Sequence, residues 1–541
     1  MDRYNYKRRS TSETKVGNIG IGGKNPIRIQ SMTNTSTMDT EGSVDQALKI
    51  AKAGGELVRL TTQGVREASN MSEIRKGLND AGCNVPIVAD VHFNPSAAFK
   101  AVETCEKVRI NPGNFVDPAR TFKKLEFTDE EYKAELEKIK ETFVPFLQKC
   151  KANNTAIRLG VNHGSLSDRI MSRYGDTPDG MVESALEYLR ICKEEGFNNV
   201  VISIKSSNVG VMVQTVELLA KKMAEEGMNY PLHLGVTEAG DAEDGRVKSA
   251  VGIGTLLGEG LGDTVRVSLT ENPENEIPVA CKLRDYIISR EGHKLIPEPK
   301  SELGLKTRVG AAKIPQHENV SYPLVIGLDI KEVPSNWHYV DTENGIPEFN
   351  DELPIVLETS NSNVPGAMAS WIERFVASGA KNPIILKVKY TDKDIEDLRI
   401  KASADLGPLL LWGYGNGIWI VAPAFIQDEL NSLSLGILQA SRLRISKTEY
   451  IACPSCGRTL FDLQKTLKEV KEATKEMKGL KIGVMGCIVN GPGEMADADY
   501  GYVGAGPGKV SLYKGKELIK KNIPSENAIS ELLELIHNSE S

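Results

Sequence analysis

The stretch IRIQSMTNTSTMDTEGSVDQALKIAKAGGELVRLT, residues 27–61, decides the fold class. It begins and ends with short β-branched runs, IRIQS (27–31) and LVRLT (57–61), and the amphipathic segment SVDQALKIAKAG (43–54) lies between them. A strand, a helix and a second strand in this order are typical of parallel sheets. The stretch therefore predicts one βα unit and the first strand of the next.

The same alternation continues to about residue 290. Six further strand-like runs follow: PIVAD (86–90), KVRIN (107–111), AIRLG (156–160), NVVISIK (199–205), PLHLGV (231–236) and DTVRVSL (263–269). Eight strands in about 250 residues predict an α/β fold, a (β/α)8 TIM barrel. An open doubly wound sheet is the alternative, because periodicity does not show whether a sheet closes.

Beyond the barrel the composition of the 541-residue chain changes. The polar, proline-containing segment REGHKLIPEPKSELGLK (290–306) predicts a linker. All four tryptophans follow it, and the apolar runs around them predict an α/β insert. The third region contains three of the eight cysteines. We therefore expect a barrel over 1–290, an insert over 291–430 and a C-terminal α+β domain over 431–541.

The composition disfavours several classes of protein. Lys and Arg total 66 against 73 Asp and Glu, a net charge of -7, so a generally basic nucleic-acid binder is not expected. The cysteines are too few for a disulfide scaffold, and the N-terminal residues lack the apolar core of a signal peptide. We expect a cytoplasmic protein with reduced thiols.

One uncharged stretch, LGPLLLWGYGNGIWIVAPAFIQ (406–427), is long enough to span a bilayer. Its glycines and prolines divide it into two runs, LLLW (409–412) and IWIVA (418–422). We expect two buried strands joined by a tight turn, and no membrane association.

Five cations occupy equivalent positions in the predicted barrel. They are Arg59, Arg109, Arg158, Arg266 and Lys205. Charged side chains are rarely buried without a partner, and barrel enzymes build their sites at the C-terminal ends of the strands. One such arginine could belong to an internal salt bridge. Five favour a phosphate or diphosphate ligand, because guanidinium groups bind phosphate oxygens bidentately.

Further polar residues lie at the same strand ends. They are Gln30, Asp90, His92, Asn111, Asn162, Glu238 and Ser268. Each residue alone has a structural explanation. Asn111, for example, precedes Pro112 and Gly113, so a role in a turn would explain it without any substrate contact. Together they predict a substrate-binding mouth.

Cys453-Pro-Ser-Cys456 is a C-x-x-C turn, and Cys487 follows it. Such a turn can serve a zinc site, a redox pair or neither. No fourth Cys or His occurs in this region apart from His537, whereas Glu494 could supply an oxygen ligand. Three thiolates and a weak oxygen donor suit a [4Fe-4S] cluster with one exchangeable iron better than a closed zinc site.

Longer motifs resemble those of a known family. They are PIRIQSMTNTSTMDT (26–40), VADVHFNP (88–95), VRINPGN (108–114), IRLGVNHGSL (157–166), YGDTPDGMVESAL (174–186), YPLHLGVTEAG (230–240), KSAVGIGTLLGEGLGDTVRVSLT (248–270), CPSCGR (453–458) and MGCIVNGPGEMADADYG (485–501). In its first and third regions the sequence resembles the 4-hydroxy-3-methylbut-2-enyl diphosphate synthases of non-mevalonate isoprenoid biosynthesis. The middle region resembles the insert of the larger, three-domain form.

The resemblance implies an iron-sulfur oxidoreductase. Its reaction would open the ring of 2-C-methyl-D-erythritol 2,4-cyclodiphosphate and remove a hydroxyl group by two-electron reduction, giving 4-hydroxy-3-methylbut-2-enyl diphosphate. Ferredoxin or flavodoxin would deliver the electrons, the insert would be a structural spacer, and a homodimer is compatible with the family.

The resemblance also implies roles for single residues. Cys453, Cys456, Cys487 and Glu494 would bind the [4Fe-4S] cluster, and Glu238 would handle a proton at the reacting carbons. The residues expected to hold the diphosphate are Arg59, His92, Arg109, Arg158, Asn162, Lys205, Arg266 and Ser268. Gln30, Asp90 and Asn111 complete the predicted substrate-binding set.

Two other functions compete with this one. A pterin-dependent barrel enzyme would share the barrel but would not need the cysteine region. A zinc-stabilised phosphate-binding protein without catalysis would share both. A visible absorption spectrum separates them, because a [4Fe-4S] cluster is brown and zinc is colourless.

Overall fold

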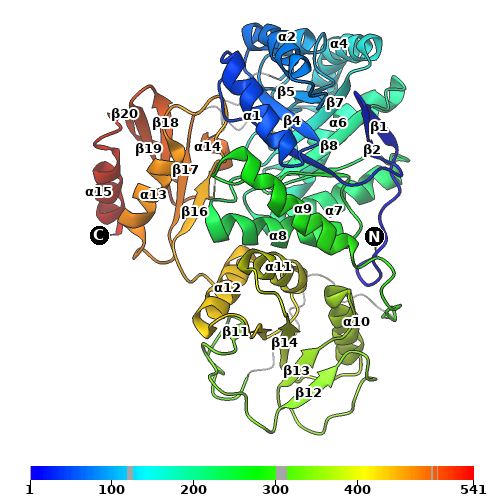
Figure 1. Ribbon diagram of the computed structural model, residues 1–541, viewed down its shortest axis with the longest axis vertical. Helices are drawn as coiled ribbons and strands as arrows, with labels where there is room; N and C mark the ends of the chain where they lie inside the picture. Colours follow the sequence, from blue (N-terminus) through cyan, green and yellow to red (C-terminus); the bar gives the residue numbers. More distant parts are fainter. Residues whose placement is uncertain (1, 118–125, 300–313, 489–490, 496, 541) are drawn as a thin grey trace. The chain divides into compact units, whose positions relative to one another are not determined.

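The computed structural model describes residues 2–117, 126–299, 314–488, 491–495 and 497–540 (Figure 1). The chain forms two compact units. One contains Met1–Arg9, Arg246–Leu261 and Cys281–Ser446, and the other contains Ser10–Gly245, Gly262–Ala280 and Lys447–Ser541.

Eight parallel strands form a barrel in the second unit. They are β3 (Arg28–Met32), β4 (Leu57–Thr62), β5 (Ile87–Val91), β6 (Lys107–Ile110), β7 (Ala156–Asn162), β8 (Val200–Lys205), β9 (His233–Leu234) and β10 (Thr264–Val265). Their order is β8-β7-β6-β5-β4-β3-β10-β9, and a parallel bridge between Ile202 and Leu232 joins the two end strands. The predicted TIM barrel is confirmed, and the open-sheet alternative is wrong.

Helices alternate with these strands along the chain. They are α1 (Thr40–Lys52), α2 (Val65–Asp80), α3 (Pro95–Ala101), α4 (Asp129–Asn153), α5 (Asp168–Tyr174), α6 (Pro178–Glu194), α7 (Val209–Glu225), α8 (Ala242–Gly258) and α9 (Glu276–Ile288), with a short 3-10 turn, η1 (Pro273–Asn275). Side-chain caps fix several helix starts: Asp39 accepts a hydrogen bond from the Gly42 N–H, and Thr177 accepts one from the Gly180 N–H.

A hairpin of β1 (Glu13–Val16) and β2 (Ile19–Gly22) packs against the N-terminal ends of the barrel strands. Val16 and Ile21 form a buried apolar cluster with residues of β4, β5, β7 and β8: Leu57, Val88, Ala156 and Val201. This apolar plug leaves the C-terminal end of the barrel as the end available for a binding site.

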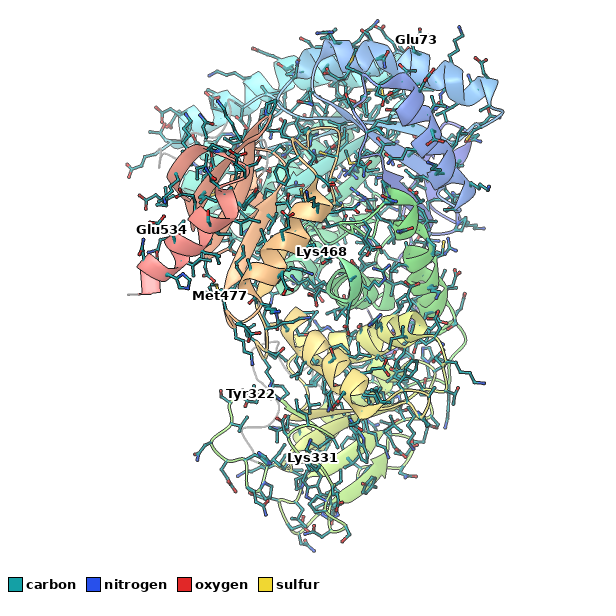
Figure 2. All side chains as sticks on the ribbon, turned by 60° about the vertical axis from the view of Figure 1, so that its left-hand side comes forward. Glu73, Tyr322, Lys331, Lys468, Met477 and Glu534 are labelled. Carbon is teal, nitrogen blue, oxygen red and sulfur yellow. The ribbon has the colours of Figure 1, made fainter. Side chains whose placement is uncertain are left out.

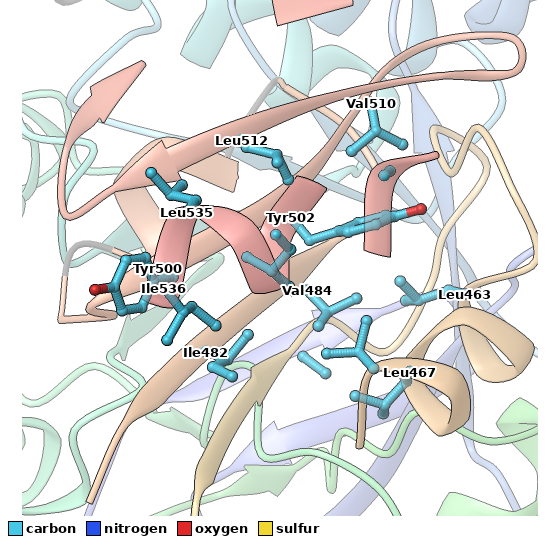
Figure 3. Packing of buried hydrophobic residues seen from close by; sticks show 14 residues of the cluster. Leu463, Leu467, Ile482, Val484, Tyr500, Tyr502, Val510, Leu512, Leu535 and Ile536 are labelled. Carbon is cyan, nitrogen blue, oxygen red and sulfur yellow. The ribbon is translucent and has the colours of Figure 1, made fainter. Parts of the chain in front are cut away.

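The third region forms a five-stranded sheet within the same unit as the barrel. Its order is β16 (Glu449–Ala452), β17 (Lys481–Met485), β18 (Tyr500–Gly506), β19 (Lys509–Lys514) and β20 (Glu517–Pro524). The helices are α13 (Leu463–Thr474), the short α14 (Gly491–Glu494) and α15 (Ala528–Glu540). Apolar side chains of α13, α15 and the sheet, including Leu467, Val484, Tyr502 and Leu512, form its core (Figure 3). The predicted C-terminal α+β domain thus has its own core.

The first unit contains a parallel sheet in the order β11 (Leu324–Val325), β15 (Gly417–Val421), β14 (Ile384–Lys389), β13 (Ile355–Glu358) and β12 (His338–Asp341). Its helices are α10 (Val364–Ala377), α11 (Ile395–Leu411) and α12 (Gln427–Ala440). The buried pair Arg290 and Asp405, with an N···O distance of 2.7 Å, ties α11 to the segment that follows α9.

The prediction of two strands in residues 406–427 is half wrong. IWIVA forms β15, but Leu409 to Leu411 form the end of α11, which continues through Pro408. Leu409 and Leu410 are buried, and this burial outweighs the backbone hydrogen bond that proline removes. Among the described residues, no helix combines the length and the apolar character needed to cross a membrane.

Candidate active site

A cavity lies at the C-terminal ends of the barrel strands, and the cysteine segments of the third region form its other wall. Its lining contains Met32, Arg59, Asp90, His92, Arg109, Arg158, Asn162, Lys205, Thr237, Glu238, Arg266, Ser268, Cys453, Pro454, Ser455, Cys456, Arg458, Met485, Gly486, Cys487 and Gly491. The five predicted cations and the three predicted cysteines therefore share one cavity.

Strand register places the polar side chains of the barrel wall next to one another. Asp90 of β5 is the register partner of Arg109 of β6, and Arg109 is the partner of Arg158 of β7. Side chains of a strand alternate between its two faces, so Asn162, four residues after Arg158, lies on the same face. All four are buried. The barrel thus presents a row of polar groups to the cavity.

Asp90 holds two arginines from different parts of the chain. Its Oδ1 accepts a hydrogen bond from Arg109 Nη1 at 3.2 Å, and its Oδ2 accepts one from Arg458 Nη2 at 3.2 Å. Burial raises the pKa of Asp90, but the charges of Arg59 and Arg109 outweigh it and hold that pKa well below its ordinary value. Asp90 is therefore ionised, and it orients both guanidinium groups.

His92 is neutral in this environment. Its Nε2 lies 3.5 Å from Asp90 Oδ2, and its ring also contacts Arg109 Nη1. Burial, followed by the charges of Arg109 and Arg458, lowers the pKa of His92 to about 3. At neutral pH the imidazole can donate or accept a hydrogen bond but adds no charge.

Arg158 and Lys205 are the cavity cations whose charge is least neutralised. Arg158 Nε and Nη1 are buried and have no hydrogen-bond partner among the described residues, and Glu238 offsets only part of the effect of burial on Lys205. Burial, together with neighbouring positive charges, lowers the pKa of both groups well below the ordinary value. A buried cation without full neutralisation is costly, so these two groups favour an anion in the cavity.

Arg266 differs from them because it already has a carboxylate partner. Its Nε and Nη2 each donate to Glu276 at 3.0 Å. Glu276 also accepts a hydrogen bond from Ser31 Oγ at 2.6 Å. The two hydrogen bonds to Glu276 thus fix the orientation of the Arg266 guanidinium group.

Glu238 follows β9 and is almost completely buried at the cavity wall. Its φ of +50° lies in the left-handed region, which non-glycine residues adopt at a cost. Such strained positions concentrate at functional sites, where they point a side chain in a required direction. The carboxylate is close enough to Lys205 to raise the pKa of that lysine, against the effect of burial.

Two parallel strands bring the cysteines together. Ala452 of β16 is the register partner of Val484 of β17, so Cys453 and Cys487 follow strand ends that lie side by side. The Gly486 N–H donates to Cys453 Sγ at 3.3 Å, and Arg458 Nη1 lies 3.9 Å from Cys456 Sγ. N–H groups and a guanidinium directed at sulfur suit thiolates that carry negative charge.

The three cysteines of this wall are compatible with a metal cluster. Within the described part of the chain, no group of three His, Cys, Asp or Glu side chains is close enough to hold one metal ion. In a [4Fe-4S] cluster each thiolate binds a different iron, so three cysteines spread around one cavity are what such a cluster needs. Glu494 ends α14, but its side chain lies outside the described residues.

Two predicted substrate-binding residues do not line the cavity. Gln30 Oε1 accepts a hydrogen bond from Lys107 Nζ at 3.3 Å, inside the barrel. Asn111 donates to Ser165 Oγ at 3.0 Å and accepts from the Gly113 N–H at 3.1 Å, so it forms the turn after β6. Substrate contact by these two residues stays a prediction.

Sequence reasoning missed three charged residues of the site. Lys107 lies two positions before Arg109 and shares its face, so the alternation of the strand could have revealed it. Arg458 lies within the quoted CPSCGR motif, but nothing in the sequence pairs it with Asp90. The sequence around Glu276 does not indicate a role in the site, because that role depends on the position of Arg266 in the fold.

Comparisons with protein-family models match two parts of the chain. Residues 11–281 match the GcpE TIM-barrel domain, and residues 449–538 match the GcpE protein C-terminal domain. The first match contains the barrel wall of the cavity, and the second contains all three cysteines of the other wall.

Similar full-length proteins are named 4-hydroxy-3-methylbut-2-en-1-yl diphosphate synthase (flavodoxin). The protein of Phocaeicola vulgatus is 51% identical, and the alignment covers 99% of this chain and 98% of that protein. The protein of Leptospira interrogans is 42% identical over 99% of this chain and 97% of its own. Among solved structures, dihydropteroate synthase of Xanthomonas albilineans covers 52% of this chain and 99% of its own, with 14% identity and a TM-score of 0.36, too low to carry an argument.

Proposed function

The chain belongs to the GcpE family, and from this premise we propose that it converts 2-C-methyl-D-erythritol 2,4-cyclodiphosphate to 4-hydroxy-3-methylbut-2-enyl diphosphate. The reaction consumes two electrons and one proton. The carbon–oxygen bond to one ring phosphate and the neighbouring carbon–hydroxyl bond break, a carbon–carbon double bond forms, and water leaves. The protein is an oxidoreductase of isoprenoid biosynthesis, and the pterin-dependent and zinc-only alternatives are not favoured.

The main support for the proposal is that incompletely neutralised cations and three cysteines line the same cavity. Arg158 and Lys205 supply charge that the described carboxylates neutralise only in part, and Cys453, Cys456 and Cys487 line the opposite wall. A cyclic diphosphate has two negative charges on a compact ring, so it can pair with the cations while its carbons face the cysteines.

The residues of the barrel have distinct tasks in this reaction. Arg158 and Lys205 bind phosphate oxygens directly, and Arg109 does so in the orientation that Asp90 imposes. Glu276 orients Arg266 in the same way. The Glu238 carboxyl group, once protonated, donates the proton with which the hydroxyl group leaves as water, and it becomes a carboxylate. Burial of the whole set excludes bulk water, which strengthens each charge interaction.

Cys453, Cys456, Cys487 and Glu494 would hold the [4Fe-4S] cluster, which would supply electrons one at a time. Arg458 lies near Cys456 and hydrogen-bonds to Asp90, so it links the cysteine wall to the diphosphate wall. The electron donor is flavodoxin, as in the names of the relatives, with ferredoxin as the alternative. The insert serves as a spacer and takes no part in the chemistry.

Absorption spectroscopy of protein purified without oxygen tests this proposal. We expect a brown protein with about four iron and four sulfide per chain and a broad visible band. Cys456→Ala should lose the iron and the band together, and Cys83→Ala, which changes a cysteine outside the cavity, should keep both. A colourless wild-type protein with stoichiometric zinc would contradict the proposal.

A further inference from the structure

Exposed apolar side chains gather around the cysteine wall of the cavity. The described residues include twelve large hydrophobic side chains that are exposed, and five of them follow β3, β4 and β5 or lie close to Cys456 and Cys487 in the sequence. We call these five the apolar rim: Met38, Val65, Phe93, Leu460 and Ile488. Each is between 37% and 52% exposed. Single exposed hydrophobic residues are ordinary, but a group of them marks a binding surface.

The two halves of the rim meet at the turn that contains Cys456. Met38, Val65 and Phe93 follow the neighbouring strands β3, β4 and β5, at the same end of the barrel. The turn that contains Cys456 rests on these loops, because a Cβ on Gly457 would lie 2.6 Å from the carbonyl oxygen of Thr35.

The cysteine segments contribute the other half of the rim. The Leu460 N–H donates to the Gly486 carbonyl at 3.0 Å, which places Leu460 beside the segment of Cys487 and Ile488. Leu460 is four residues from Cys456, and Ile488 directly follows Cys487. A molecule seated on the rim would therefore touch the protein at the outer side of the cysteine site.

Phe93 adds an energetic argument. Its φ of +57° is left-handed, a conformation that is unfavourable for an L-residue, and its ring is 44% exposed. Strained positions concentrate at functional sites, and a bound partner would remove the ring from water.

Charges of both signs lie beside the rim. Arg66 on α2 and Lys468 on α13 are exposed and make no ion pair with any described residue (Figure 2 shows Lys468). Asp39 and Asp462 are also exposed, and they accept backbone N–H groups at the starts of α1 and α13. The apolar side chains are therefore the main feature that a partner would recognise, and the two unpaired cations can pair with carboxylates of that partner.

We propose that the apolar rim is the docking surface for the electron donor, a flavin-bearing protein of the flavodoxin kind. The inference rests on the proposed function and adds the place at which the electrons enter. A docked flavin would approach Cys456 and Cys487 from outside while the substrate occupies the cavity on the barrel side. A patch of five side chains suits a transient electron-transfer complex, whose interface is small.

Two charge-introducing variants with a matched control test the surface. Val65→Glu and Leu460→Glu place a carboxylate in each half of the rim. Leu518→Glu makes the same change at a leucine that is 43% exposed on β20, outside the rim. Turnover of the loaded enzyme is measured with reduced flavodoxin and, separately, with reduced methyl viologen. Binding of oxidised flavodoxin is measured by isotope-edited NMR.

We expect both rim variants to lower kcat/KM for flavodoxin and to weaken its binding by at least tenfold, with viologen turnover unchanged. Leu518→Glu should behave as wild type. Lys468→Glu should also weaken binding, and its effect should shrink as salt is added, because salt screens exposed charges.

Wild-type affinity for flavodoxin in both rim variants, with viologen turnover intact, would overturn the docking proposal alone. A rim variant that changes the molecular mass in solution would also overturn it, because the rim would then bind a second copy of this chain. Failure of the wild-type protein to turn over with viologen would instead contradict the proposed function.

Discussion

Arg158 and Arg266 are both buried arginines of the cavity wall, but only Arg266 has a carboxylate partner. Arg158→Met should weaken substrate binding by roughly tenfold or more, since a charge-assisted hydrogen bond to phosphate contributes about 1.5–3 kcal/mol. It should not lower the melting temperature of the substrate-free protein, because it removes an unpaired buried charge. Calorimetric titration and thermal unfolding measure the two effects.

Arg266→Met is the matched comparison. It leaves Glu276 buried without its guanidinium partner, so it should destabilise the protein by about 3–5 kcal/mol. Equal losses of stability in the two variants would show that Arg158 has a partner and would remove the main argument for an anion in the cavity.

We expect the protein to take up a proton at Lys205 when substrate binds. Burial, together with the charges of Arg59 and Arg158, lowers the pKa of Lys205, and a bound anion must raise it again. The complex then holds more protons than the free protein, so affinity falls as pH rises through the pKa of the free protein. Each phosphate of the cyclic substrate is a diester and stays ionised, so it supplies no proton.

Titration calorimetry at pH 8 in buffers of different ionisation enthalpy measures this uptake. Wild type should take up protons, and Lys205→Met should take up fewer. Release of protons by the wild-type protein on binding would contradict the assignment.

At the level of elements, the sequence indicates strands well because each barrel strand is a short apolar run between polar segments. All eight runs contain a strand, although β9 and β10 comprise only two residues each. The error at the end of α11 has a physical cause: Gly407 and Pro408 are strong local signals, and tertiary burial outweighed them. The β1–β2 hairpin was not predicted, because its importance depends on the strand ends that it covers.

The loop after β7 meets the loop of α14 through two glycines. A Cβ on Gly164 would lie 2.2 Å from the Gly493 carbonyl oxygen, next to Glu494. Gly164→Ala should therefore push the α14 loop away from the barrel and lower turnover at least tenfold, while iron content stays close to that of wild type. Iron analysis and viologen turnover measure the two effects.

Gly196→Ala is the control for backbone strain alone. Gly196 also has a positive φ, +60°, but a Cβ there would meet nothing within 4 Å. If Gly196→Ala reduced turnover as much as Gly164→Ala, the cause would be strain, and the contact between the loops would not matter.

For the whole molecule, the cavity is the feature that local patterns could not predict. Its walls come from residues 32–268 and 453–491, and the pairing of Arg458 with Asp90 spans 368 positions. Strand periodicity places the cations at one end of a barrel, but it does not bring the cysteines to that end. The family motifs indicated that the cations and the cysteines form one site, and the hydrogen bond between Arg458 and Asp90 joins the two walls.

Arg458 of the cysteine wall hydrogen-bonds to Asp90 of the barrel in the same chain, so we expect a site that is complete without a partner. A chain with Arg158→Met, mixed with a chain with Cys456→Ala under conditions of subunit exchange, should regain no activity. A site shared between two chains would regain part of it, because a mixed dimer combines one intact barrel with one intact cysteine wall. Clear rescue would exclude the single-chain site.

Product analysis by phosphorus NMR tests directly whether the protein catalyses the proposed ring opening. Protein reconstituted with iron and sulfide is incubated without oxygen with 2-C-methyl-D-erythritol 2,4-cyclodiphosphate and reduced methyl viologen. We expect the two ring-phosphate signals to be replaced by the signals of a linear diphosphate monoester. Unchanged ring signals in protein with its full complement of iron would contradict the proposed function.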